Sequence, residues 1–235
     1  TSSNPGEGKS TVIGNLALTV AAAGQPVILI DADLRRPRQA LQFGVDGRVG
    51  LSEVLNGDVA LQDVLIPVGE DGLLLLPAGR TPPNPSEQLG SERMKDLLTA
   101  LAETHMVLVD APPVLPVTDS TLLAAAVDGT VLVIRHGKTR KEHLEVARDM
   151  LAGVNARVLG VVDGSGCLSA ERGGGIVNVV AALGDRQRDD PGGRCAQEGQ
   201  DDLRVIGGEE VVVDRADDRR VAQPAGVLAD EGVEL

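Results

Sequence analysis

A glycine-rich stretch at the start of the chain has the residue types of a phosphate-binding loop. The segment "SSNPGEGKST" (2–11) fits the pattern G-x-x-x-x-G-K-[ST] from Gly8 onward, with Ser3 where the first glycine usually stands. Such a loop turns successive backbone N–H groups toward phosphate oxygens, above the N-terminus of the helix that follows. The segment therefore predicts a site for a nucleoside triphosphate.

The loop residues have separate predicted tasks. Gly6 and Gly8 let the backbone adopt the shape of the loop, Lys9 reaches the β- and γ-phosphates, and the Ser10 hydroxyl is placed for Mg²⁺. The threonine next to it lies close to the α-phosphate. The predicted cofactor-binding residues are Gly6, Glu7, Gly8, Lys9, Ser10 and Thr11.

Carboxylates follow two apolar, strand-like segments. "VILIDADLRRP" ends in Asp31 and Asp33, and "VLVDAPP" contains Asp110. Residues two apart in an extended segment point the same way, so Asp31 and Asp33 face one site, where one can hold Mg²⁺ or water and the other can take a proton. We predict Lys9, Asp31 and Asp33 as catalytic residues. We predict Ser10, Asp31 and Asp110 as the groups that hold the metal.

Three arginines, Arg35, Arg36 and Arg38, come directly after this acidic motif. The sequence leaves their role open: they bind phosphate, they bind an acidic surface of a partner, or they form a solvated face.

The elements that would position these residues alternate between strands and helices. Apolar runs rich in β-branched residues indicate buried parallel strands, and segments with helical spacing end at glycines. This alternation predicts an α/β fold, a P-loop NTPase-like parallel sheet with helices on both faces. The expected strands are 26–31, 73–79, 106–110, one within 128–137, and 156–162; the expected helices are 9–23, 51–57, 86–104 and 140–153.

Composition excludes some classes of partner. The formal net charge of −13 argues against a nucleic-acid partner or an anionic membrane surface. No apolar run approaches the length of a membrane-spanning helix. With one Phe, no Tyr and no Trp, the core must be aliphatic.

The chain divides near residue 163. All lysines and all of the expected elements lie in 1–162, which we predict to be a P-loop kinase or ATPase domain. Residues 163–235 form an acidic, glycine-rich tail, which we expect to be disordered. We also hypothesise that this tail is translated out of frame, the alternative being a genuine divergent tail.

The motifs together resemble one family. "SSNPGEGKST", "NLALTVAAAGQPVILIDADLRRP", "PAGRTPPNPSEQLGSERM", "VLVDAPPVLPVTD" and "VLVIRHGKTRKEHLEVARDML" are similar, in this order, to segments of the bacterial tyrosine autokinases of capsular and exopolysaccharide synthesis. The resemblance covers about residues 1–162. The order and spacing of DADLRRP and DAPPVLPVTD distinguish this family from the septum-placement and plasmid-partition ATPases.

The resemblance implies an activity and a setting. It implies transfer of the γ-phosphoryl group of ATP, with Mg²⁺, to tyrosines in a C-terminal cluster. It implies a membrane-spanning chain-length regulator, fused upstream or supplied as a separate subunit, association between copies of the chain, and a place in the cytoplasm at the inner face of the plasma membrane. It assigns Lys9, Ser10 and Thr11 to the Walker A motif, Asp31 and Asp33 to the second acidic motif, and Asp110 to Walker B.

The chain departs from the family pattern at four places. The strand that should precede the loop is absent, so we expect the fold's first strand, and a helix with an oligomerisation motif, to lie upstream of this fragment. Thr104-His105 replaces Tyr-Asp, "DGSGCLSAERGGG" replaces an adenine-lining stretch, and there is no tyrosine.

Two further functions stay open beside the kinase. The missing tyrosines favour a regulatory ATP-binding module that gates a polysaccharide polymerase without phosphorylating anything. A partition-type ATPase fits the motifs less well.

Overall fold

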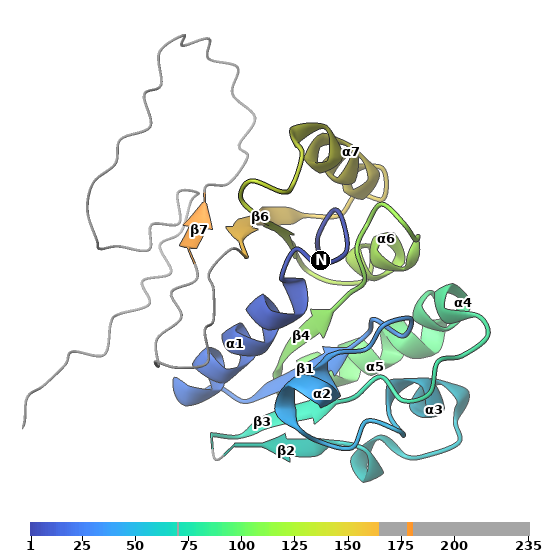
Figure 1. Ribbon diagram of the computed structural model, residues 1–235. Helices are drawn as coiled ribbons and strands as arrows, with labels where there is room; N and C mark the ends of the chain where they lie inside the picture. The colour runs from blue at the N-terminus through green and yellow to red at the C-terminus, as the bar shows by residue number, and fades with distance from the viewer. Residues whose placement is uncertain (70, 165–177, 181–235) are drawn as a thin grey trace, which may run out of the picture.

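One sheet is built around the strand that carries the acidic motif (Figure 1). In the computed structural model, which describes residues 1–69, 71–164 and 178–180, this sheet has the strand order β2-β3-β1-β4. β1 (Val27–Asp31) pairs in parallel with β3 (Leu73–Leu76) and with β4 (Met106–Asp110). β2 (Ile66–Val68), which the sequence analysis missed, is antiparallel to β3 at the edge.

A second sheet has the order β5-β6-β7. β5 (Thr130–Ile134) pairs in parallel with β6 (Val158–Asp163), and β7 (Asn178–Val180) pairs with β6 in the antiparallel direction. The expectation of one parallel sheet is therefore confirmed for the pairing of the predicted strands, while the described strands fall into two sheets with an antiparallel strand at one edge of each.

The first residues of the chain connect the two sheets. Thr1 O accepts a hydrogen bond from Val133 N of β5 at 2.8 Å, and Ser2 O accepts one from Val114 N, beyond β4, at 2.8 Å. The start of the phosphate loop is thus held from both sides. The strand expected ahead of the loop would precede residue 1 and stays a prediction.

Helices cover both faces of the first sheet, as predicted. Side chains alternate along β1: Val27 and Leu29 pack with Ala17 and Ala21 of α1 (Lys9–Ala22), whereas the residues between them face the other side. Three helices cover that other side: α3 (Leu51–Asn56), α4 (Pro85–Leu89) and α5 (Glu92–Ala102).

The remaining helices lie near the loops of the site. α7 (Lys141–Ala152) packs on the second sheet. α6 (Asp119–Ala124) contributes Ala124 to the core of that sheet and Leu123 to the core of the first, and α2 (Gln39–Phe43) follows β1 and contacts α1. A short 3-10 turn spans Leu61–Asp63.

Two predictions of elements need comment. The single helix predicted at 86–104 is wrong, because α4 ends at Leu89 and Ser91 caps α5 by accepting a hydrogen bond from Met94 N at 3.3 Å. The predictions for the tail fall mostly outside the described residues; within it, 163–164 and β7 are described.

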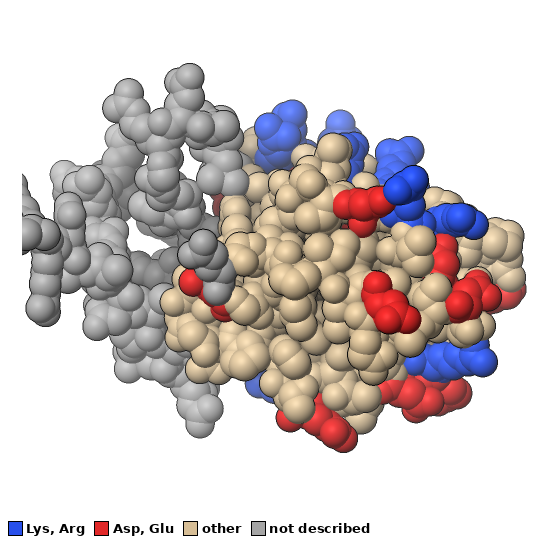
Figure 2. Space-filling view, turned by 90° about the horizontal axis from the view of Figure 1, so that it is seen from below, with Lys and Arg blue, Asp and Glu red and all other residues tan. Residues whose placement is uncertain are grey.

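The surface seen from below the view of Figure 1 has most of its visible Lys and Arg side chains along the upper margin, others near the lower edge, and a central area without charged side chains (Figure 2). Among the described residues, no helix has the length and apolar character needed to cross a membrane.

We expect truncation of two leucines, one in the core and one on the surface, to change the free energy of unfolding by very different amounts. Leu29 in β1 has no exposed surface, whereas the side chain of Leu41 is 76% exposed. Leu29→Ala is expected to lower the free energy of unfolding by about 2–5 kcal/mol, because it leaves a cavity between the sheet and α1. Leu41→Ala, the control, is expected to change it by less than about 0.5 kcal/mol. Urea unfolding of both variants checks this, and equal effects would contradict the packing described.

Candidate nucleotide-binding and phosphotransfer site

The phosphate loop turns into α1 through two left-handed glycines. Gly6 has a φ of 78° and Gly8 a φ of 94°, a region that side chains disfavour. Gly8 is the N-cap of α1, and Lys9 begins the helix. The backbone therefore has the shape that the motif predicts, with the positive end of a helix dipole directly below the loop.

The segment between β5 and α7 braces this loop. Glu7 is 4% exposed; its Oε2 accepts a hydrogen bond from Asn4 N at 2.8 Å, and its Oε1 accepts one from Thr139 Oγ1 at 2.5 Å. Arg135 N in turn donates to Thr139 Oγ1 at 2.8 Å. The carboxylate of Glu7 is therefore occupied with holding the loop, and its contact with a nucleotide stays a prediction.

Further contacts hold the same side of the loop. Asn4 Nδ2 lies 3.0 Å from His143 Nδ1, and Arg135 Nη1 donates to Gly6 O at 3.3 Å. Gly164, just after β6, approaches so closely that a Cβ there would lie 2.5 Å from Glu7 O. A side chain at this position would push the loop away.

Two carboxylates meet at the carboxyl ends of neighbouring strands. Asp31 ends β1 and Asp110 ends β4, and the parallel register pairs them directly. Asp31 has no exposed surface and Asp110 is 2% exposed. The predicted convergence of these residues is present in the structure.

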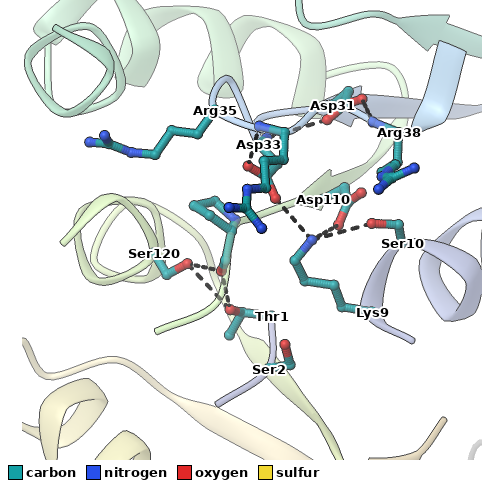
Figure 3. Close-up of polar contacts among 12 residues, drawn as sticks. Thr1, Ser2, Lys9, Ser10, Asp31, Asp33, Arg35, Arg38, Asp110 and Ser120 are labelled. Atoms are coloured by element: carbon teal, nitrogen blue, oxygen red, sulfur yellow. Dashed lines mark hydrogen bonds and ion pairs between the residues drawn. The ribbon is translucent and has the colours of Figure 1, made fainter. Parts of the chain in front are cut away.

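Lys9 reaches across the site to the acids (Figure 3). Its Nζ donates to Asp33 Oδ2 at 3.0 Å and to Ser10 Oγ at 3.3 Å, and lies 4.0 Å from Asp110 Oδ1. Lys9, Ser10, Asp33 and Asp110 thus form one cluster, while Thr11 is exposed on α1.

Asp31 is surrounded by backbone donors. Its Oδ2 accepts from Arg38 N and Gln39 N, each at 2.9 Å, and its Oδ1 accepts from Asp33 N at 3.3 Å. Burial raises the pKa of Asp31 to about 7, helped by the negative charge of Asp110, although the three backbone hydrogen bonds act in the opposite direction.

One of the three arginines has a defined partner. Arg35 Nε donates to Asp119 Oδ2 at 2.7 Å, and its Nη2 donates to Asp119 Oδ1 and to Ser86 Oγ, both at 3.2 Å. Burial alone would raise the pKa of Asp119, but the hydrogen bonds from Arg35 and Ser86 outweigh it and hold that pKa below its usual value. Arg35 therefore joins the loop after β1 to α6 and α4, a role outside the three alternatives that the sequence left open.

The oxygen groups at the site suit Mg²⁺. No cluster of three or more His, Cys, Asp or Glu side chains among the described residues forms a metal site alone. Mg²⁺ commonly takes only one or two carboxylates and completes its shell with phosphate oxygens and water. Asp110 and the Ser10 hydroxyl offer that donor set, whereas Asp31 is already engaged by three N–H groups. The residues present fit the ion.

Sequence reasoning missed three residues of the site: Gln39, Thr139 and His143. Gln39 Nε2 donates to Asp110 Oδ2 at 2.7 Å. No motif marks these positions; the only available signal was that each lies close in sequence to an element that ends at the site.

Comparison with known proteins decides the family. No protein-family model matches the chain. The tyrosine-protein kinase YwqD of Bacillus subtilis is 43% identical over 163 residues, which cover 69% of this chain and 69% of YwqD. The chain belongs to the bacterial tyrosine-protein kinases. The tyrosine-protein kinase CpsD of Streptococcus agalactiae is 33% identical over 164 residues, which cover 69% of this chain and 72% of CpsD.

A solved structure of this kinase family has the same fold. The kinase domain of the Escherichia coli tyrosine kinase ETK is 35% identical, with a TM-score of 0.66 over 68% of this chain and 64% of that one. The family resemblance drawn from the motifs is confirmed. The division of the chain near residue 163 stays a prediction.

The hydrogen bond from Thr139 to Glu7 is expected to stabilise the folded protein. Thr139→Val keeps the shape but removes the hydroxyl donor to the buried carboxylate of Glu7, so the free energy of unfolding is expected to fall by about 1–3 kcal/mol. Thr99→Val, at an exposed position on α5, is the control. Urea unfolding measures both, and a Thr139 variant as stable as the Thr99 variant would show that the contact contributes nothing.

The raised pKa of Asp31 predicts a pH dependence in metal-free buffer. Its ordinary pKa is 3.8, so between about pH 4 and pH 7 the folded protein binds a proton that the unfolded chain releases. The free energy of unfolding is therefore expected to fall as pH rises through this window, by at most about 1.4 kcal/mol per pH unit from this group. Above pH 7 this contribution to the slope ends.

Asp31→Asn isolates that contribution, since the amide does not titrate. Urea unfolding of the wild type and the variant with EDTA, at several pH values between 4 and 8, gives the two slopes. A slope that is the same in both proteins would assign the pH dependence to other groups.

Proposed function

We propose that this chain transfers the γ-phosphoryl group of ATP, with Mg²⁺, to tyrosine side chains. One observation carries the proposal: Lys9 and Ser10, at the start of α1, lie beside Asp33, two residues beyond β1, and Asp110, at the end of the adjacent strand β4. This places a cation, a hydroxyl and carboxylates around the position that a triphosphate takes on such a loop. Membership of the tyrosine-protein kinase family supports tyrosine as the acceptor.

The loop and α1 bind the nucleotide. The backbone N–H groups around Gly6 and Gly8 and the helix N-terminus hold the phosphates, and Lys9 contacts the β- and γ-phosphates. Ser10 and Asp110 would hold Mg²⁺, which neutralises charge on the β- and γ-phosphates when it is bound. Catalysis then consists mainly of positioning and of stabilising charge.

Asp31 and Asp33 divide two tasks. Asp33 anchors Lys9, whereas Asp31, which accepts hydrogen bonds from three backbone N–H groups, holds the first turn of α2 beside the site. In the transfer, the bond between the γ-phosphorus and the β–γ bridging oxygen breaks, a bond from the phosphorus to the phenolic oxygen forms, and the phenolic proton passes to a carboxylate. ADP is the leaving group.

The biological setting is part of the proposal. The tyrosine-protein kinases that resemble this chain include CpsD and a putative kinase named CapB from Staphylococcus aureus. We place the chain in the control of capsular or exopolysaccharide synthesis, at the cytoplasmic face of the plasma membrane. Its proposed partner there is a membrane-spanning chain-length regulator, and copies of the kinase associate with one another.

Lys9→Met tests the loop. Methionine has a similar length but no charge and no donor, so phosphotransfer is expected to fall on the order of 100-fold or more. The matched control is Lys95→Met, at a solvent-exposed lysine on α5, which is expected to keep full activity. Because the 235 residues contain no tyrosine, the assay uses radiolabelled ATP and a synthetic glutamate–tyrosine polypeptide as the acceptor.

The chemical form of the radiolabelled product distinguishes a tyrosine kinase from a regulatory ATP-binding module. Phosphotyrosine on the acceptor, lost in Lys9→Met and kept in Lys95→Met, supports the proposal. Free phosphate alone would instead indicate the regulatory ATP-binding module. Equal activity of the two variants would refute the assignment of the loop.

A further inference from the structure

The first turn of α2 contains a buried glutamine that faces the acids of the site. Gln39 begins α2 and has no exposed surface. Its side chain extends between the start of α1 and the end of β4, which are the two elements that carry Ser10 and Asp110. No motif singles out this residue, and the proposed reaction does not yet use it.

The chemistry of its neighbours fixes the orientation of the Gln39 amide. Nε2 lies 2.7 Å from Asp110 Oδ2 and 3.0 Å from Ser10 O. A carboxylate and a backbone carbonyl only accept, so the group that contacts both must be the NH₂. One amide thus connects the strand end that holds Asp110 to the helix turn that holds Ser10.

The backbone of the same residue acts on the other buried acid. Gln39 N donates to Asp31 Oδ2 at 2.9 Å, next to the bond from Arg38 N. Gln39 is therefore the residue that touches Asp31, Asp110 and Ser10 together. These are the three residues predicted from the sequence to hold the metal, and at Ser10 the contact is to the backbone carbonyl, next to the hydroxyl of the same residue.

This arrangement leaves one polar atom without a partner. Gln39 Oε1 is buried and has no hydrogen bond within the described part of the chain. It lies against α1 at Gly14, where an added Cβ would be 3.3 Å from Oε1 and 2.4 Å from Gln42 Nε2, so Gly14 leaves room for both glutamine side chains. A buried acceptor without a donor lowers stability, and residues that carry such a cost are found mainly at functional sites.

We propose that Gln39 is a positioning residue that sets the affinity of the site for Mg²⁺, by holding the Asp110 carboxylate at a fixed place relative to Ser10. The inference rests on the proposed function, since it requires Mg²⁺ with a nucleotide at this site. Gln39 does not touch the metal. It occupies Oδ2 of Asp110 and so leaves Oδ1 on the side of Lys9, whose Nζ lies 4.0 Å away.

The other contact of Asp110 cannot serve this purpose during turnover. Lys9 lies 4.0 Å from Asp110 Oδ1, but the proposed reaction requires Lys9 on the phosphates. When Lys9 contacts a phosphate, Gln39 Nε2 is the side-chain donor that keeps the Asp110 carboxylate in place. The amide can do so because α2 and α1 hold it independently of the nucleotide.

Gln39→Met is the decisive variant, because methionine has a similar size but no donor. Binding of ADP is measured by calorimetry in EDTA and over a series of Mg²⁺ concentrations, and binding of Mn²⁺ to the ADP complex by electron paramagnetic resonance. The Mg²⁺ concentration at half-saturation is expected to rise roughly 10- to 100-fold, with the affinity for ADP in EDTA unchanged. The control is Gln62→Met, the same change at an exposed position outside the site.

Two outcomes would overturn the role proposed for Gln39. Equal Mg²⁺ dependence in the two variants overturns the proposal, and so does an equal loss of ADP affinity with and without Mg²⁺, which would mark Gln39 as merely structural. If Gln39→Met does not fold, Gln39→Asn replaces it: its shorter amide cannot reach both acceptors, and the same weakening of Mg²⁺ binding is expected. A wild-type protein whose ADP affinity ignores Mg²⁺ would overturn the proposed function and this inference together.

Discussion

Two carboxylates on adjacent parallel strands set the conditions for the rest of the site. The register of β1 and β4 places Asp31 beside Asp110, and both are almost fully buried. Buried charges of like sign are costly unless donors surround them. The compensation comes from separate elements: the Lys9 ammonium of α1 lies 4.0 Å from Asp110, and backbone and side-chain N–H groups at the start of α2 donate to both acids. The acids therefore fix α1 and α2 relative to the sheet, and the phosphate loop is positioned with them.

A second set of contacts ties the loop to the other sheet. Glu7 accepts from Thr139, which follows β5, and Gly164 after β6 allows the loop to approach. The opening residues of the chain hydrogen-bond to β5 and to the segment after β4. The loop thus lies at the junction of the two sheets, so a change in how they meet would alter the direction of its N–H groups. Its shape depends on tertiary contacts as much as on its glycines.

These contacts explain which parts could be predicted. The positions of Lys9 and Ser10 at the loop, and of Asp31 beside Asp110, could be predicted because loop spacing and strand ends are local patterns, and parallel pairing brings strand ends together. Gln39 was not found, because its partner Asp110 lies 71 residues away and no local pattern marks a glutamine at the start of a short helix. Thr139 was missed for the same reason, 132 residues from Glu7. The break between α4 and α5 was missed because the apolar spacing continues across the cap at Ser91.

The charges of the site also couple its ligands. Lys9 is paired with Asp33 and lies 4.0 Å from Asp110, so it is part of the compensation for buried negative charge. A triphosphate that takes Lys9 for itself leaves those carboxylates facing more negative charge, which opposes binding in a site of low dielectric constant. A divalent cation between Asp110 and the phosphates replaces the lost positive charge. A divalent cation alone would meet Lys9 beside Asp110 and be repelled by it. We therefore expect each ligand to bind more weakly without the other, so that Lys9 makes nucleotide and metal binding cooperative.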